Sequence, residues 1–251
     1  MKIVDMNVAL GEKNEDGKEL TPELLYGMME AYGIDRAVAY HATAKLDHPT
    51  GNAIMSNIAK ESGGRIGFCA VIDPALGANS LEGEGSLAAR LRASGAEAIR
   101  VFPTKLRVAF HPFYFEEVLE AAEELSMPII IDDNYPVSPV PELFSRLPDM
   151  ARAYPGIKFI IIRYGTCNGR HIKPLATKCD NVYFTVEKML DYQQIEELCA
   201  AGASSKLLFG SEYPMLDVGG ALGLVLCADI SDEERRSILA ENWEAIKYVN
   251  S

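Results

Sequence analysis

The segment FEEVLEAAEELSMPIII, residues 115–131, shows the repeating unit from which the fold is predicted. Its first part carries apolar side chains at helical spacing, namely Phe115, Val118, Leu119, Ala122 and Leu125. The run Ile129–Ile131 that follows is short and β-branched, as in a strand buried on both faces. The segment therefore predicts a helix followed by a strand.

Seven further short apolar runs recur along the chain, separated by stretches with helical periodicity. They are Ile3–Val8, Arg36–Tyr40, Ile66–Ile72, Ala98–Phe102, Ile157–Ile162, Val182–Val186 and Leu207–Phe209. Strand alternating with helix predicts a parallel sheet, and eight such units favour a closed (β/α)₈ barrel. No G-x-G-x-x-G follows the first run, which counts against an open dinucleotide-binding sheet. The 251 residues are expected to form one α/β barrel domain, residues 1–251.

Local signals predict several helix boundaries. Thr21-Pro22 is typical of a helix start, and Gly33 of the end of the same helix. Ser231 and Glu234 have the spacing of a capping box for the terminal helix. Pro148 is expected to interrupt the helical stretch 142–154.

Composition narrows the classes of function. The net charge of −12 disfavours a nucleic-acid-binding role, which needs a concentrated basic surface. No apolar run reaches the roughly 18 residues that span a bilayer, and the start Met1–Asp5 lacks a signal-peptide core, so a cytoplasmic protein is expected. The five cysteines are widely spaced without a C-x-x-C pair, which favours structural thiols over disulfides or a cysteine zinc site. A homodimer is expected only because symmetric dimers are the commonest oligomers of soluble proteins.

Several segments, in order, resemble the amidohydrolase-related family of metal-dependent TIM-barrel hydrolases. Those that carry the resemblance include Lys2–Asp5, Gly33–Val38, Gly67–Pro74, Ala98–Pro103, Glu120–Ala122, Met127–Ile131, Tyr154–Phe159 and Leu208–Pro214. The resemblance covers almost the whole chain and implies the same barrel. It also implies metal-assisted hydrolysis, or the related decarboxylation, of a small carboxylate- or amide-bearing compound.

The family's metal ligands are replaced at the matching positions. The resemblance implies a His-x-His pair after the first strand, single histidines after the fifth and sixth, and an aspartate after the eighth. This chain has Asn7 and Ala9, then Asp132, Arg163 and Glu212 at those places. Ala9 has no donor atom and arginine is a permanent cation, so we expect no family metal centre and no other cofactor.

Two interpretations of the replaced site stay open. In the first, Arg163 acts as a fixed cation held between Asp132 and Glu212, because a buried guanidinium needs carboxylate partners. In the second, Asp132 and Asp133 join Glu212 in holding a divalent cation such as Mg²⁺ or Mn²⁺. A solvated Arg163 in an open barrel mouth is the simpler alternative to both.

Other candidate site residues lie at or near the carboxyl ends of the predicted strands, where barrel enzymes build their sites. His41 is a candidate general acid or base, although a structural histidine is the more common outcome. Arg100 is a candidate anion-binding group if it faces inward, which the strand register decides. Asn7, Asp133 and Glu187 are candidate ligand-binding residues.

Two hypotheses for function follow. The first is a metal-independent hydrolase or decarboxylase in which Asp132 or His41 carries a proton and Arg163 stabilises negative charge. The second is a non-catalytic barrel that binds a small anionic ligand.

Overall fold

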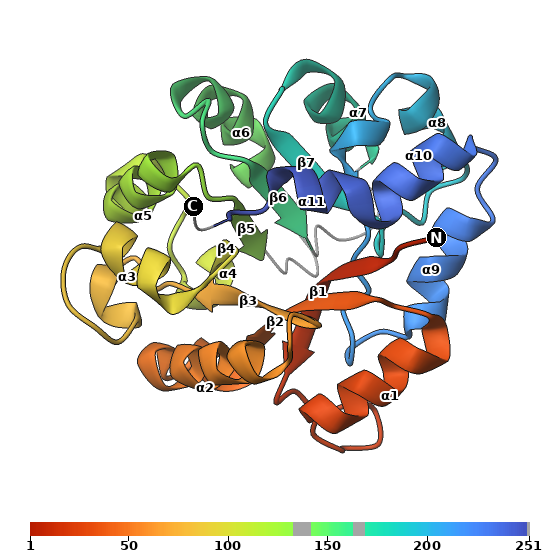
Figure 1. Ribbon diagram of the computed structural model, residues 1–251. Helices are drawn as coiled ribbons and strands as arrows, with labels where there is room; N and C mark the ends of the chain where they lie inside the picture. Colours follow the sequence, from red (N-terminus) through yellow and green to blue (C-terminus); the bar gives the residue numbers. More distant parts are fainter. Residues whose placement is uncertain (133–141, 163–168, 250–251) are drawn as a thin grey trace.

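The computed structural model describes residues 1–132, 142–162 and 169–249, and in these ranges it forms a (β/α)₈ TIM barrel (Figure 1). Neighbouring strands pair in parallel in chain order. The barrel closes where the Met6 amide donates to the Phe209 carbonyl at 3.1 Å and the Ala9 amide donates to the Tyr213 carbonyl at 2.9 Å. The strands are β1 (Val4–Leu10), β2 (Arg36–His41), β3 (Ile66–Val71), β4 (Ala98–Val101), β5 (Ile129–Asp132), β6 (Phe159–Ile162), β7 (Val182–Thr185) and β8 (Leu207–Leu208).

Helices form the outer layer around these strands (Figure 1). The α-helices are α1 (Pro22–Tyr32), α2 (His48–Glu61), α3 (Leu87–Ser94), α4 (Pro103–Leu106), α5 (Pro112–Leu125), α6 (Glu142–Ala153), α7 (Gly169–Lys178), α8 (Gln194–Ala200), α9 (Val218–Leu226), α10 (Asp232–Arg236) and α11 (Asn242–Ile246). Short 3₁₀ turns lie at η1 (Ala42–Lys45), η2 (Gly77–Ser80) and η3 (Ser204–Lys206), and the π-helical turn η4 (Ser237–Glu241) joins α10 to α11. None of the helices in the described ranges is long and apolar enough to cross a membrane.

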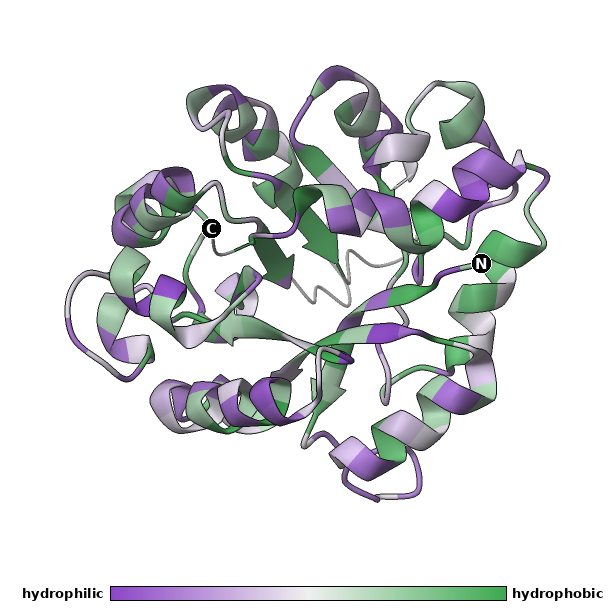
Figure 2. Cartoon of the chain, in the orientation of Figure 1, coloured by the Kyte–Doolittle hydropathy of each residue, from purple (hydrophilic) through white to green (hydrophobic). Residues whose placement is uncertain are grey.

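Strand alternation divides the apolar core into two clusters. On β4, Ile99 and Val101 pack outward under the helices, whereas Ala98 belongs to the cluster inside the barrel. Trp243 and Ile246 of α11 also belong to the inner cluster, which extends to Val4 at the start of β1. Figure 2 accordingly shows apolar strands inside helices of mixed polarity. The same alternation turns the polar residues Arg100 and Asp132 toward the interior.

The predicted helix caps are confirmed. Thr21 accepts a hydrogen bond from the Leu24 amide, and Gly33 ends α1 with a left-handed φ of 68°. Ser231 and Glu234 form the capping box of α10. The terminal helix that they open is not one regular helix, because the π-helical turn separates α10 from α11.

The prediction that Pro148 interrupts a helix is wrong. Helix α6 continues through this residue. A proline removes one backbone hydrogen bond, but Leu147 and Met150 on the same helix are almost completely buried. We infer that packing of this apolar face outweighs the lost bond.

Candidate active site at the carboxyl ends of the strands

Four inward-facing polar side chains meet inside the barrel near the carboxyl ends of their strands. They are Asn7 of β1, Arg100 of β4, Asp132 at the end of β5 and Glu187 just after β7, and each is at most 4% exposed. In a TIM barrel this end carries the active site. All four are among the predicted site residues, and the register of β4 settles that Arg100 faces inward.

Arg100 is the central cation of this group. Its Nε and Nη2 donate to Asp132 Oδ2 at 3.1 and 2.7 Å, and Nη2 also donates to Asn7 Oδ1 at 3.0 Å. Its guanidinium lies 4.2 Å from the ring centre of Tyr40. Burial is the largest single influence and opposes the charge of Arg100, but the attraction and hydrogen bonding of Asp132, together with smaller contributions from Tyr40 and Cys69, outweigh it and raise the pKa of Arg100. Arg100 is therefore a permanent cation.

Glu187 lies on the other side of Asn7. The Asn7 amide nitrogen Nδ2 donates to Glu187 Oε1 at 3.1 Å, and the Thr185 hydroxyl donates to the same oxygen at 2.8 Å. Burial raises the pKa of Glu187 to about 8, despite these hydrogen bonds. Its other oxygen, Oε2, is buried and has no hydrogen-bond partner among the described residues. Burial thus favours the protonated form of Glu187 near neutral pH, and no described residue occupies Oε2.

Glu212 lies next to this group in the segment after β8. Its amide donates to the Asn7 carbonyl at 3.0 Å, and its carboxylate pairs with Lys188 Nζ at 3.3 Å. Its charge is a further, smaller cause of the raised pKa of Glu187. The backbone of Glu212 has a φ of 61°, a left-handed value that is uncommon for a residue other than glycine. Such strain is often found at functional sites.

His41 ends β2 and forms a different set of contacts. Its Nδ1 accepts a hydrogen bond from the Thr43 amide at 3.3 Å, and burial lowers its pKa. A Cβ atom built on Gly11 would come within 2.7 Å of the imidazole, so the loop after β1 passes directly over this ring. This hydrogen bond caps the turn η1. It does not connect His41 to Arg100 or to Glu187.

Three residues near the site were missed by the sequence reasoning. Thr185 holds Glu187, and the rings of Tyr40 and Phe102 pack against Arg100. Tyr40 lies two residues after Val38 on β2, and Thr185 lies two residues after Tyr183 on β7. Since Val38 and Tyr183 face the barrel interior, the alternation of side chains along a strand could have identified both residues. Lys45 of η1 also lies 5.3 Å from the Tyr40 ring centre and pairs with Glu12.

Two predicted site residues, Arg163 and Asp133, lie outside the described residues. The proposed pairing of Arg163 with Asp132 and Glu212 therefore stays a prediction. Asp132 does pair with a guanidinium, that of Arg100, which sequence reasoning had assigned only a ligand-binding role.

The described residues do not fit the divalent metal that the family resemblance implies. Ala9 has no donor atom, and both amide atoms of Asn7 are engaged by Arg100 and Glu187. Asp132 faces the Arg100 guanidinium, and Glu212 faces Lys188, so each carboxylate already has a cation beside it. Within the described ranges there is no group of three His, Cys, Asp or Glu residues placed to hold a metal ion.

Comparison with known proteins places this barrel among others of the same architecture. A TIM-barrel protein from Bordetella bronchiseptica is 17% identical, with a TM-score of 0.74 and 98% of each chain covered. The 5-carboxyvanillate decarboxylase from Sphingomonas paucimobilis is 11% identical, with a TM-score of 0.73 and 98% of each chain covered. A dihydroxybenzoic acid decarboxylase from Polaromonas, with bound manganese and the inhibitor 2-nitroresorcinol, is 13% identical with a TM-score of 0.71, and 98% of this chain and 96% of that chain are covered.

At these identities the similar structures establish the fold alone. The search of curated proteins returned no match. The model of the amidohydrolase family, however, matches residues 6–246, which is nearly the whole chain. The chain therefore belongs to the amidohydrolase family.

Proposed function

We propose that this barrel catalyses a metal-independent reaction on a small carboxylate-bearing compound, with decarboxylation favoured over hydrolysis. The observation that carries the proposal is the geometry of Glu187, because Asn7 and Thr185 hold its Oε1 while its buried Oε2 has no hydrogen-bond partner among the described residues. A carboxylic acid that is still protonated near pH 7 and has a free buried oxygen is suited to general acid catalysis.

Arg100 supplies the fixed positive charge in this proposal. Among the described residues its hydrogen bonds use Nε and Nη2, which leaves Nη1 for an oxygen of the substrate. Because Asp132 and Asn7 hold the guanidinium rigidly, it needs no reorganisation when negative charge develops. Asn7 contacts both Arg100 and Glu187, so the cation and the acid lie on either side of one amide group.

Decarboxylation requires one proton at the right place and no activated water. The carbon–carbon bond to the substrate carboxylate breaks, carbon dioxide leaves, and the bonding electron pair stays on the substrate. Glu187 delivers its proton to that carbon and is protonated again from solvent. Hydrolysis of an amide would also require a base to activate water, and His41 is not joined to this network. Two of the similar barrels are decarboxylases, which makes this reaction the first to test.

The test is carbon dioxide release from a panel of small aromatic and aliphatic carboxylates, with the protein treated with a chelator. Replacing Glu187 by glutamine keeps the shape but removes the proton, so we expect a rate loss of about 10²–10⁴-fold. Glu123→Gln is the matched control, because Glu123 also has a buried oxygen without a hydrogen-bond partner among the described residues but lies on α5. Full activity in Glu187→Gln would contradict the proposal, as would activity that returns only when a divalent metal is added.

A second candidate function is a non-catalytic barrel that binds a small anion. The cation Lys45 favours it, because Lys45 and Arg100 pack against the same two rings, Tyr40 and Phe102. Under this alternative the carboxylates of the panel raise the melting temperature but release no carbon dioxide. In that case Glu187→Gln leaves the shift in melting temperature intact.

A further inference from the structure

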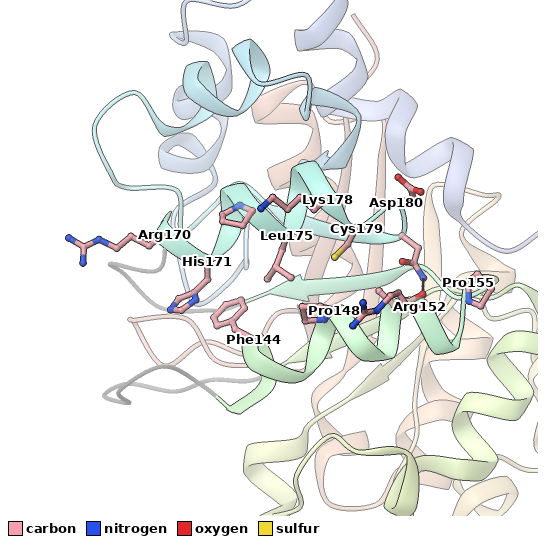
Figure 3. A pocket seen from close by; sticks show the side chains of 13 residues that line it. Phe144, Pro148, Arg152, Pro155, Arg170, His171, Leu175, Lys178, Cys179 and Asp180 are labelled. Atoms are coloured by element: carbon pink, nitrogen blue, oxygen red, sulfur yellow. Dashed lines mark hydrogen bonds between the residues drawn. The ribbon is translucent and has the colours of Figure 1, made fainter.

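A cavity lies in the outer layer of the barrel, between α6 and α7 (Figure 3). Its volume is about 540 Å³, within the range of about 300–1,000 Å³ that is usual for small-molecule sites. Its lining includes neither Arg100 nor Glu187. It is therefore separate from the candidate active site.

Part of the lining of this cavity is apolar. Pro148 and Pro174 contribute rings without amide hydrogens, and Leu175 adds an aliphatic side chain to the lining. At one end the rings of Phe144 and His171 stack, with centres 5.3 Å apart and planes 5° from parallel (Figure 3). Walls of this kind favour a planar aromatic ring as the occupant.

The polar groups of the cavity include a fixed hydrogen-bond acceptor. Asn181 is 8% exposed, and its Nδ2 donates to the carbonyls of Ala151, Tyr154 and Ile157 at 3.2, 3.0 and 2.8 Å. These three acceptors fix the orientation of the amide, so Oδ1 must point away from them. Oδ1 has no hydrogen-bond partner among the described residues, and Asn181 lines the cavity. Because Oδ1 is not among the buried atoms that lack a partner, it is accessible, and the hydrogen-bond donor of a ligand can reach it.

The charge around the cavity is positive although the chain as a whole is acidic. Arg152, Arg170 and Lys178 line it against one acid, Asp180, whereas the whole chain carries a net charge of −12. Helix α7 itself has basic residues and no acid. Arg170 extends away from the cavity in Figure 3, so Arg152 and Lys178 are the relevant cations. The ion pair of Arg152 with Asp149 is exposed and therefore weak, so a ligand carboxylate competes with it.

We propose that the cavity between α6 and α7 binds a small aromatic carboxylate that also carries an N–H or O–H donor. The ring lies against Pro148, Leu175 and Pro174, the carboxylate faces Arg152, and the donor meets Asn181 Oδ1. This site does not depend on the reaction proposed for the barrel mouth.

Three indole compounds test the proposal by titration calorimetry with the full chain. Indole-3-acetate has the ring, the carboxylate and the N–H donor, and we expect saturable binding with a dissociation constant on the order of 1 mM or below. Its 1-methyl analogue lacks the donor and should bind about 3- to 10-fold more weakly. Tryptamine replaces the carboxylate by an ammonium group and should not bind. Absence of saturable binding by indole-3-acetate, or equal binding of all three compounds, overturns the proposal.

Protein variants locate the binding. Arg152→Ala should weaken indole-3-acetate about 2- to 5-fold, because it removes one exposed charge interaction. The matched control is Lys173→Ala, which removes a cation from α7 that does not line this cavity and should leave the affinity unchanged. Glu187→Gln should also leave it unchanged. Affinity that falls in Glu187→Gln but not in Arg152→Ala would assign the ligand to the barrel mouth and overturn the proposal.

Discussion

Asp132 and Glu187 are two carboxyl groups buried in one site, and they differ in what lies beside them. Asp132 meets the guanidinium of Arg100 at 2.7 Å, whereas Glu187 receives hydrogen bonds only from the neutral groups of Asn7 and Thr185 among the described residues. Neutral donors do not offset the loss of hydration, so the pKa of Glu187 rises to about 8. Asp132 therefore belongs to a buried ion pair, whereas the surroundings of Glu187 favour its protonated form, although both carboxyl groups are almost completely buried.

The largest expected effect comes from removing the cation of the ion pair. Arg100→Met leaves Asp132 buried without its guanidinium, and we expect a loss of about 3–5 kcal/mol in the free energy of unfolding. Chemical denaturation measures it. The matched control is Arg92→Met, which breaks an exposed pair with Glu124 and should cost about 1 kcal/mol or less. A loss below about 1 kcal/mol for Arg100→Met would show that Asp132 does not depend on Arg100.

Removing both charges should cost less than removing one. In the double variant Arg100→Met with Asp132→Leu no charge of the pair remains buried, so we expect recovery of about 1–3 kcal/mol relative to Arg100→Met alone. Denaturation of the two single variants and the double variant gives the interaction energy directly. Costs that simply add would mean that the two side chains contribute independently.

The next prediction concerns pH and Glu187. The folded-state pKa of this carboxyl is raised from 4.5 to about 8, so the folded protein holds a proton that the unfolded chain releases. Its contribution to stability is fully present below pH 4.5 and is lost as the pH rises toward 8. Asp5, with a pKa raised to about 6 mainly by burial, adds a slope of the same sign only at lower pH.

Thermal unfolding between pH 6 and 8 tests Glu187 by comparison with Glu187→Gln, because the opposite slope from His41 and His48, whose pKa values burial lowers from 6.5, is common to both proteins. The melting temperature of the parent protein should fall across this window more steeply than that of Glu187→Gln. Equal slopes in the two proteins would mean that Glu187 is already ionised at pH 6.

The smallest expected effect is at Thr185. Its hydroxyl donates to Glu187 Oε1 and lowers the pKa of that carboxyl. Thr185→Val removes this bond, so the pKa of Glu187 should rise further, with a stability cost of about 1 kcal/mol. The pH profile of activity, or of unfolding, should move to higher pH. A shift to lower pH would contradict the assignment of Thr185 as a donor to Glu187.

The barrel could be predicted from sequence because its signal repeats. All eight strands lie where apolar runs were found. The helix caps at Thr21, Gly33 and Ser231 were also predictable, because each cap is formed by residues only a few positions apart in the sequence. Pro148 was misjudged because a local rule ignores the burial that the helix gains from its neighbours. The exact strand ends also differ, because the start of β6 at Phe159 depends on pairing with β5 and β7.

The candidate site was predicted only in part. Asn7, Arg100, Asp132 and Glu187 were named, but the pairing of Arg100 with Asp132 was not, because it depends on which faces of β4 and β5 these two residues occupy. His41 was the preferred acid–base candidate from the usual pKa of an imidazole, whereas burial raises the pKa of Glu187 to about 8, and no cation among the described residues pairs with its carboxyl group. Burial of a single side chain is a tertiary property that sequence spacing does not show.

The amide of Asn7 also limits how this barrel can change over evolutionary time. It accepts from Arg100 with one atom and donates to Glu187 with the other. Histidine at this position would have to replace both bonds at once to avoid leaving a buried group unsatisfied, and Ala9 would still lack a donor atom. Single substitutions at Asn7 would therefore pass through less stable proteins, so we expect this amide to change only together with its partners Arg100 and Glu187.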